Sequence, residues 1–203
     1  IEFSGGRFTI AGTDRGIDIM ELAQALRDDP PKDGPDSLDV DHISSDVQST
    51  FPNGCHVAEV EVDPDTGTVE IVRYTGVNDF GVVVNPMMVA GQIHGGVAQG
   101  IGQALMECVT YDSSGQPVTG SFMDYALPRA CDIPNITVGD HPSPATTNPL
   151  GTKGCGEAGC AGSLSTVVNA VLDALGDVGV THLNMPLTPE RVWQAIQQAR
   201  KAA

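Results

Sequence analysis

Aromatic and basic residues are the two most evident shortages of this chain. Only 4% of its 203 residues are aromatic, which argues against a protein that stacks the bases of single-stranded nucleic acid on aromatic rings. Lysine and arginine together number 10 against 26 aspartates and glutamates, so the formal net charge is −16. A field of this sign repels nucleic acids and anionic membrane surfaces, and its simplest role is to keep the protein soluble.

Paired cysteines and long apolar runs are also missing. The chain has five cysteines, none of them in a Cys-x-x-Cys pair, and an odd, scattered set does not suggest a disulfide framework. We therefore expect reduced thiols and a cytoplasmic protein. No unbroken apolar run is long enough to cross a bilayer. The five histidines lack the spacing of metal ligands, so no metal site is predicted from protein side chains.

The remaining pattern predicts an α+β fold in two parts. A short strand is expected within Gly6–Gly12, and apolar residues at helical spacing predict a helix over Ile17–Arg27. The segment 28–36 is rich in proline, aspartate and glycine, which is typical of a loop or linker. We accordingly expect residues 1–35 to be a strand–helix piece of an incomplete domain, and residues 36–203 to form the main domain.

The main domain begins with a β-rich region, expected over Leu38–Asp79. Apolar and acidic residues alternate over Val57–Val62, as in a half-exposed strand. The segment Asp63–Gly67 has turn chemistry, and Thr68–Tyr74 follows as the return strand.

A long helix is predicted from Asn85-Pro86 to about Cys108. Its apolar stripe contains Ala90, Ile93, Val97, Ile101, Ala104 and Cys108, and its opposite stripe contains Gln92, Gly95, Gly96, Gln99 and Gln103. His94 lies on the apolar side and is expected to pack in the core. The amide and glycine stripe fits a polar ligand lying against the helix. The residues alone favour a helix-packing groove with a polar rim, because Gly91/Gly95 and Gly96/Gly100 have small-residue spacing.

Two further helices are predicted near the C-terminus. The first follows a glycine-rich loop, with Ser163 as its expected N-cap. The second opens at Thr188-Pro189-Glu190, which supplies an N-cap, a first-turn proline and an early acid. Together with the strands, these helices predict a β-sheet packed against a long Gln/Gly-striped helix and two C-terminal helices.

The glycine-rich loop, residues 148–162, is the strongest chemical candidate. It contains five glycines, with Glu157 as its single acid and Lys153 as its single base. A carboxylate on a tight turn suits a general base, although it could instead accept hydrogen bonds from the loop amides. Residues 154–159 match G-x-G-x-x-G literally, but a proline-rich loop precedes them where a dinucleotide site requires a strand.

Three motifs in this order resemble a known family. They are GQIHGGVAQGIGQAL at 91–105, YALP at 125–128 and GCGEAG at 154–159. Together they are similar to the C-terminal part of the molybdenum-binding large subunit of the xanthine dehydrogenase / aldehyde oxidase / carbon monoxide dehydrogenase family, the molybdenum hydroxylases. The resemblance extends from about Phe3 to the closing segment 186–193.

This resemblance implies a molybdopterin cofactor, in its cytosine dinucleotide form in many bacterial members. It implies that Glu157 is the catalytic base, that Gln99 contacts the pterin and that Gly156 brings backbone close to it. The reaction would be hydroxylation or oxidation of an aldehyde, N-heterocycle, purine or CO, with water as the oxygen source.

The resemblance also implies partners. Electrons would leave through [2Fe-2S] clusters to FAD on partner subunits or domains, and the rest of the molybdenum subunit would complete the site. We therefore expect a fragment or split subunit that is inactive alone. A non-catalytic assembly domain and a nucleotide-dependent oxidoreductase using the glycine loop remain as alternatives.

Overall fold

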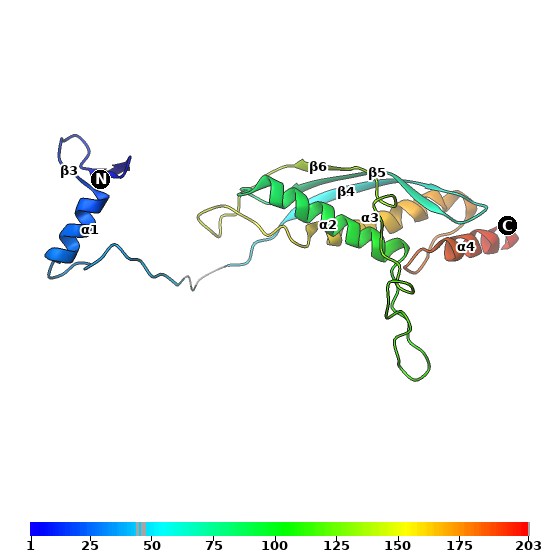
Figure 1. Cartoon of the computed structure of the whole chain (residues 1–203). Helices are drawn as coiled ribbons and strands as arrows, with labels where there is room; N and C mark the ends of the chain where they lie inside the picture. The colour runs from blue at the N-terminus through cyan, green and yellow to red at the C-terminus, as the bar shows by residue number, and fades with distance from the viewer. Residues whose placement is uncertain (44, 46–47, 203) are drawn as a thin grey trace. The chain divides into compact units, whose positions relative to one another are not determined.

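The structure is a computed structural model that describes residues 1–43, 45 and 48–202, and it confirms an α+β fold (Figure 1). It divides into two compact units, Ile1–Asp46 and Val47–Ala203. In chain order the elements are β1 (Glu2–Ser4), β2 (Arg7–Thr9), β3 (Gly16–Asp18), α1 (Ile19–Asp28), β4 (Asn53–Val62), β5 (Val69–Asp79), α2 (Pro86–Leu105), β6 (Ile136–Asp140), α3 (Ala158–Ala174), a 3₁₀ turn (Gly176–Val178) and α4 (Pro189–Ala202).

The first unit is a three-stranded antiparallel sheet followed by α1. The prediction that the helix includes Ile17 is wrong, because Ile17 lies in β3 opposite Phe8. Asp18 stops the helix from starting earlier: its carboxylate accepts from the backbone N–H of Met20 at 2.8 Å, and Glu21 reaches back to the Asp18 N–H. This reciprocal capping box fixes the first helical residue at Ile19.

The second unit is built on the sheet β4-β5-β6, in which β4 and β5 are antiparallel and β5 and β6 are parallel. The β region expected from Leu38 begins only at Asn53. Leu38 and Val40 alternate with aspartates, but both side chains are exposed, so among the described residues no neighbouring element covers an apolar face there. Part of that expectation falls on Ser44, Asp46 and Val47, which lie outside the described residues. The return strand extends further than predicted, to Asp79.

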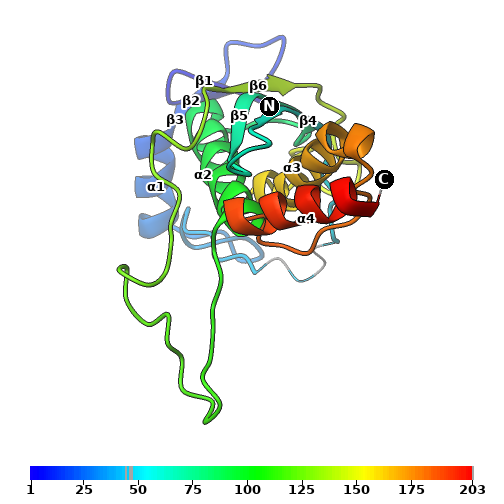
Figure 2. The same cartoon turned by 90° about the vertical axis from the view of Figure 1, so that its right-hand side faces the viewer.

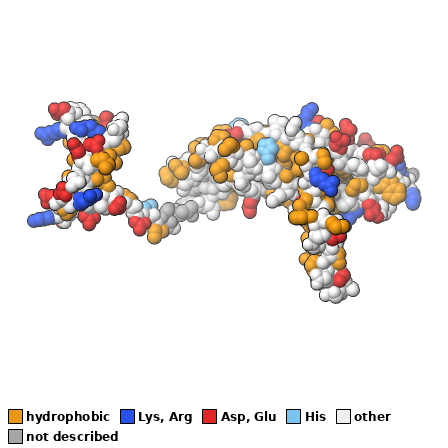
Figure 3. Space-filling view, viewed as in Figure 1, with side chains coloured by type: hydrophobic (Ala, Val, Ile, Leu, Met, Phe, Trp, Pro, Cys, Tyr) orange, Lys and Arg blue, Asp and Glu red, His pale blue; other side chains and the backbone are white. Residues whose placement is uncertain are grey.

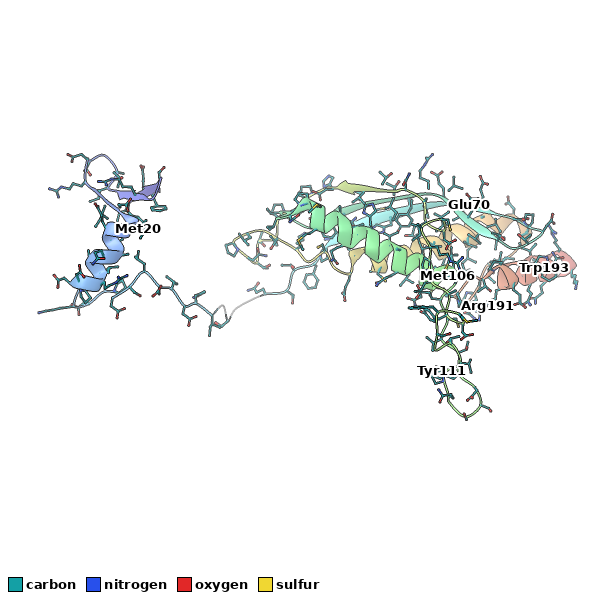
Figure 4. All side chains as sticks on the ribbon, viewed as in Figure 1. Met20, Glu70, Met106, Tyr111, Arg191 and Trp193 are labelled. Atoms are coloured by element: carbon teal, nitrogen blue, oxygen red, sulfur yellow. The ribbon has the colours of Figure 1, made fainter. Side chains whose placement is uncertain are left out.

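The turn between β4 and β5 is confirmed at Asp63–Gly67. Gly67 has φ +75°, and a Cβ there would lie 2.6 Å from the backbone nitrogen of Trp193 on α4 (Figure 4). Glycine is therefore required for both the turn and the packing of α4. Asp63 accepts from the Asp65 N–H at 2.9 Å and from Thr66 Oγ1 at 2.7 Å, and these bonds hold the pKa of its carboxyl below the ordinary value.

One face of this sheet is covered and the other is open. The covered face packs against α3, and α3 packs against α2, as the end-on view shows (Figure 2). The core combines residues of β5, α2, α3 and α4. Its most deeply buried members are Tyr74, Ile93, Val97, Ile101, Val167, Val171, Leu187, Val192 and Ile196. On the open face Val57, Val72 and Val77 remain exposed.

The predicted start of α2 is confirmed. Asn85 caps the helix by accepting from the Met88 N–H at 3.1 Å, and Pro86 is its first residue. The prediction for His94 is wrong: its side chain is exposed, and Nδ1 lies 2.7 Å from the carbonyl oxygen of Ala90 one turn earlier.

The prediction of Ser163 as an N-cap is also wrong. α3 begins at Ala158, five residues earlier, and Ser163 is buried inside it. The glycines of the first two turns join the helix despite their low helix propensity, because a side chain at Gly159 would collide with α2 and one at Gly162 would collide with His56 of β4. The expected opening of α4 is confirmed: Thr188 Oγ1 accepts from the Arg191 N–H at 3.5 Å.

A long loop, the arm (residues 108–124), extends away from the C-terminal end of α2 (Figures 1 and 3). Tyr125 Oη donates to Glu107 Oε2 at 2.6 Å and closes its base, and the carboxylate of Glu107 raises the pKa of that phenol. Toward the tip, Tyr111 pairs with Pro117 (Figure 4). Phe122 and Met123 on the arm are 83% and 96% exposed. Among the described residues, no helix is long and apolar enough to cross a membrane.

Candidate active site

The site begins with the crossing of α2 and α3, where the two backbones touch. A Cβ at Gly96 would lie 2.8 Å from the backbone nitrogen of Cys160, and a Cβ at Gly159 would lie 2.6 Å from the carbonyl oxygen of Ile93. At Gly100 a Cβ would collide with the side chain of Ser163. Side chains at these positions would separate the helices, so the glycines fix the N-terminal end of α3 against α2. Gly96 and Gly100 thus belong to a packing groove.

The glycine-rich loop is tied to the sheet by a largely buried ion pair. Lys153 Nζ lies 2.5 Å from Asp79 Oδ2 at the end of β5, and the Lys153 N–H donates to the carbonyl of Phe80 at 2.9 Å. Asp79 also accepts from the N–H groups of Gly81 and Ser143 at 2.9 and 2.8 Å. The Lys153 ammonium, helped by these two bonds, holds the pKa of the Asp79 carboxyl well below its usual range. Lys153 is therefore a structural anchor for the loop.

Glu157 is the residue immediately before α3, and its side chain is exposed. It makes no capping hydrogen bond to its own helix. The positive end of the helix dipole nevertheless favours a carboxylate at this position. A Cβ on the neighbouring Gly156 would lie 3.9 Å from Gln92 Oε1. The glycine loop and the amide stripe of α2 therefore meet at Gln92.

The amide stripe divides: Gly96 is buried against α3, and its other members form an exposed ridge. Gln92, Gly95, Gln99 and Gln103 are exposed, and a Cβ on Gly95 would meet no atom within 4 Å. Gln99 borders a hollow of about 460 Å³, here called the Gln99 hollow. Its walls also include Gln103, Glu107, Tyr125 and Cys160. The exposed ridge offers both donors and acceptors beside bare backbone.

Glu157 borders a second hollow, of about 400 Å³, here called the Glu157 hollow. Its walls include Asn53, Gly54 and His56 of β4, Asn78 of β5, and Glu157 and Gly162. The structure therefore does not bring Glu157 and Gln99 into one hollow. Cys160, one turn after Glu157, lines the hollow of Gln99, so the first turn of α3 separates the two.

A buried polar chain ends at the Glu157 hollow. His56 Nδ1 lies 2.7 Å from Tyr74 Oη, and His56 Nε2 lies 3.1 Å from Asn78 Oδ1. Burial raises the pKa of Tyr74 to about 12, although hydrogen bonds with Thr166 and Ser163 partly oppose this shift. Asn78 is 2% exposed, and its Nδ2 has no hydrogen-bond partner among the described residues.

Sequence reasoning missed His56, Tyr74 and Asn78. A signal was present, because Tyr74 and Asn78 lie four residues apart in the return strand and therefore share one face, which is the covered face, where polar side chains need partners. Their common partner, His56, depends on the pairing of β4 with β5, which places His56 opposite Gly76 and Gly54 opposite Asn78.

The geometry also bears on two other kinds of site, a dinucleotide site and a metal site. The G-x-G-x-x-G match follows a loop rather than a strand, and its last glycine, Gly159, is buried against α2. This is not the strand–turn–helix arrangement of a dinucleotide site. Within the part of the chain that the structure describes, no three His, Cys, Asp or Glu side chains gather to hold a metal ion.

One protein-family model matches the greater part of the chain. Residues 1–134 match the model of the molybdopterin cofactor-binding domain. The chain belongs to this family. The matched residues include the ridge with Gln99 but end before the loop with Gly156 and Glu157.

Known proteins of this family resemble the chain along its length. It is 38% identical to 6-hydroxypseudooxynicotine dehydrogenase complex subunit gamma of Paenarthrobacter nicotinovorans, over 100% of this chain and 26% of the relative. The structure of a Cu,Mo-CO dehydrogenase in its carbon monoxide reduced state superposes with a TM-score of 0.89 at 30% identity, over 100% of this chain and 26% of that one.

Quinoline 2-oxidoreductase from Pseudomonas putida 86 superposes with a TM-score of 0.83 at 37% identity, over 95% of this chain and 25% of that one. The molybdopterin-domain chain therefore spans about a quarter of the length of the relatives it matches.

Proposed function

We propose that this chain supplies the catalytic base and part of the molybdopterin pocket of a molybdenum hydroxylase. The observation that carries the proposal is the meeting of the Glu157 loop with the amide ridge at Gln92, within a molybdopterin-domain fold. An exposed carboxylate that follows directly on a loop glycine approached by an exposed amide suits a base at the edge of a polar cofactor's binding surface.

The residues present fit a molybdopterin. The exposed amides of Gln92 and Gln99 can pair with the donor and acceptor edge of a pterin, and the open backbone at Gly95 and Gly154 allows a ring to approach closely. We assign Gln99 and Gly156 to cofactor binding. When bound, the molybdopterin supplies the two-electron oxidation of the substrate.

Glu157 contributes general-base catalysis. Its carboxylate accepts the proton from the oxygen nucleophile that water provides. This role requires mainly that the carboxylate lies within hydrogen-bond reach of that proton. Its exposure in this chain is consistent with a site completed by other parts of a larger subunit, since the relatives are about four times as long. We expect no turnover by the chain alone.

The proposed partners follow from the family. They are the remainder of the molybdenum subunit and subunits or domains carrying [2Fe-2S] clusters and FAD, with the cofactor in its cytosine dinucleotide form. The relatives named for quinoline and for 6-hydroxypseudooxynicotine are 37% and 38% identical, against 30% for the CO dehydrogenase structure. An N-heterocycle is therefore the first substrate class to assay, followed by aldehydes, purines and CO.

Glu157→Gln in the complete enzyme tests the proposal. We expect normal molybdenum and pterin content but a loss of about 10²–10⁴-fold in kcat, the usual contribution of a positioned base. Glu61→Gln, a similar change on the exposed side of β4, is the matched control and should leave kcat unchanged. Wild-type turnover by the Glu157 variant would refute the assignment.

Gln99→Ala tests the cofactor assignment separately. We expect pterin and molybdenum content to fall during dialysis while kcat per bound molybdenum stays within about threefold, since one hydrogen bond contributes about 1 kcal/mol. Gln198→Ala on α4 is the control, because that side chain lies outside both hollows. Full cofactor retention by the Gln99 variant would contradict the assignment.

A further inference from the structure

The ring of His56 on β4 packs against glycines of two other elements. A Cβ on Gly76 of β5 would lie 3.1 Å from His56 Nε2. A Cβ on Gly162 of α3 would lie only 2.6 Å from His56 Cε1 and 2.9 Å from Cγ. Residues without side chains at both positions leave room for the ring. The ring therefore limits how closely the second turn of α3 can approach the sheet.

The His56 ring is itself fixed. Its Nδ1 lies 2.7 Å from Tyr74 Oη, and its Nε2 lies 3.1 Å from Asn78 Oδ1. Both partners are buried residues of β5. The rings of His56 and Tyr74 also meet edge to face, with centroids 5.7 Å apart. A ring held at both nitrogens by buried partners cannot swing aside, so it acts as a rigid spacer.

The helix that rests on this spacer carries Glu157 at its start. The Glu157 carbonyl accepts from the Ala161 N–H at 2.9 Å, which joins its backbone to the first turn of α3. Gly162 follows in the second turn. The same two turns touch α2 at Gly159, where a Cβ would lie 2.6 Å from the carbonyl oxygen of Ile93. Contacts with α2 and with the His56 ring thus fix the backbone next to Glu157.

We propose that His56 is a positioning residue for Glu157: its ring holds the first turns of α3 at the distance from the sheet that places the carboxylate for proton transfer. The inference rests on the proposed role of Glu157 as a base. Glycine is less favourable than alanine inside a helix. At Gly162 it allows the helix backbone to lie directly on the ring.

The distances indicate how sensitive this arrangement is. Carbon atoms in ordinary contact lie about 3.5 Å or more apart, so a methyl group at Gly162 would have to move away from the ring by about 1 Å. Because the His56 ring is fixed, the helix would move, and Glu157 would move with it. A misplacement of about 1 Å in an active site can lower the rate about 10²-fold.

Gly162→Ala in the complete enzyme is the first test. We expect kcat per molybdenum to fall about 10- to 100-fold, with KM within about twofold and unchanged molybdenum content, because the base moves while the substrate and cofactor sites stay. A crystal structure of the variant should show the start of α3 displaced from β4. Gly176→Ala is the matched control and should retain the wild-type kcat, since a Cβ there meets no atom within 4 Å.

His56→Ala distinguishes positioning from a general structural role. Without the ring, the methyl group of Gly162→Ala has space, so the double variant should have a kcat within about threefold of His56→Ala alone. Two independent structural defects would instead multiply in the double variant. If Gly162→Ala alone does not fold, the double variant should still fold with the kcat of His56→Ala.

Three results would overturn the inference. They are a wild-type kcat for Gly162→Ala, an equal loss of kcat from this change with and without the His56 ring, and a double variant that fails to fold. A loss of turnover in Glu157→Gln would keep the base assignment in each of these cases. If Glu157→Gln retains its turnover, the proposed function itself fails, whatever the Gly162 and His56 variants do.

Discussion

At the scale of single residues, two buried side chains of β5 strongly favour one protonation state. The Asp79 carboxylate is held by Lys153 and two backbone donors, and Tyr74 is kept neutral in the core. Both residues are on β5, and both connect that strand to the region of Glu157. The pH dependence of the free energy of unfolding that these two residues cause therefore reports whether the region of Glu157 is intact.

Acid should weaken the Asp79–Lys153 anchor. The folded-state pKa of Asp79 is depressed, so its stabilising contribution is complete above the ordinary aspartate value of about 4 and disappears as the pH falls below it. Lys153→Met should lower the free energy of unfolding at pH 7 and make the acid dependence below about pH 4 shallower. Urea titrations from pH 2 to 7 would check this. Lys201→Met, an exposed change on α4, should follow the wild type.

Alkali should weaken the core through Tyr74. The folded pKa of about 12 exceeds the ordinary value of 10, so its contribution is complete below pH 10 and is lost as the pH rises toward 12. Tyr74→Phe should flatten that loss in urea titrations between pH 9 and 12. Tyr111→Phe on the exposed arm should not change it. Equal slopes for the wild type and Tyr74→Phe would contradict this account.

At the scale of elements, the close crossing of α2 and α3 decides where Glu157 lies. A methyl group at Gly100 would meet Ser163 and the carbonyl of Cys160, whereas one at Gly91 on the same helix would meet nothing within 4 Å. Gly100→Ala should therefore lower the free energy of unfolding by about 1–3 kcal/mol through overpacking. Gly91→Ala should raise it by about 0.5–1 kcal/mol through the better helix propensity of alanine. Urea denaturation would measure the free energy of unfolding of both variants. Equal effects of Gly100→Ala and Gly91→Ala would contradict the close packing of α2 and α3 at Gly100.

Local patterns in the sequence predicted most of these elements. Alternation located β4, Asn85-Pro86 fixed the start of α2, and Thr188-Pro189 fixed the start of α4. Ser163 misled the prediction for α3 because packing against α2 extends the helix through glycines that local propensity disfavours. The prediction for His94 was wrong because this residue borders the apolar stripe of α2 but no neighbouring element of the described structure covers its side chain.

The candidate site was predictable only in part. Glu157 stands out locally as one acid among glycines, and the exposed amides follow from helical periodicity. The His56–Asn78 pair did not stand out, because its residues are 22 positions apart and meet only through the register of β4 with β5. The role of Lys153 likewise depends on Asp79, 74 residues earlier. Such pairings are invisible to patterns within a single segment.

At the scale of the whole molecule, the accessibility of the arm to protease should differ between the purified chain and a larger assembly that covers it. Phe122 and Met123 are adjacent on the arm and almost fully exposed, so a neighbouring segment could cover both of these apolar side chains together. If the remainder of a larger subunit covers the arm, chymotrypsin should cut the purified chain first near Phe122 and should leave the complete enzyme uncut there. Trp193, exposed to 41% but within α4, should resist cleavage in both. Equally rapid cutting of the arm in the complete enzyme would contradict this.

The open face of the β4–β5 sheet has a practical consequence for handling the protein. Val57, Val72 and Val77 lie there unprotected, and Glu59 and Glu61 of edge strand β4 stand among them. Mutual repulsion between copies, each with a net charge of −16, opposes pairing of these surfaces in dilute buffer. Because the screening length shrinks to about 3 Å at 1 M salt, concentrated salt should drive reversible clustering. Light scattering against ionic strength would reveal it, and low-salt storage would prevent it.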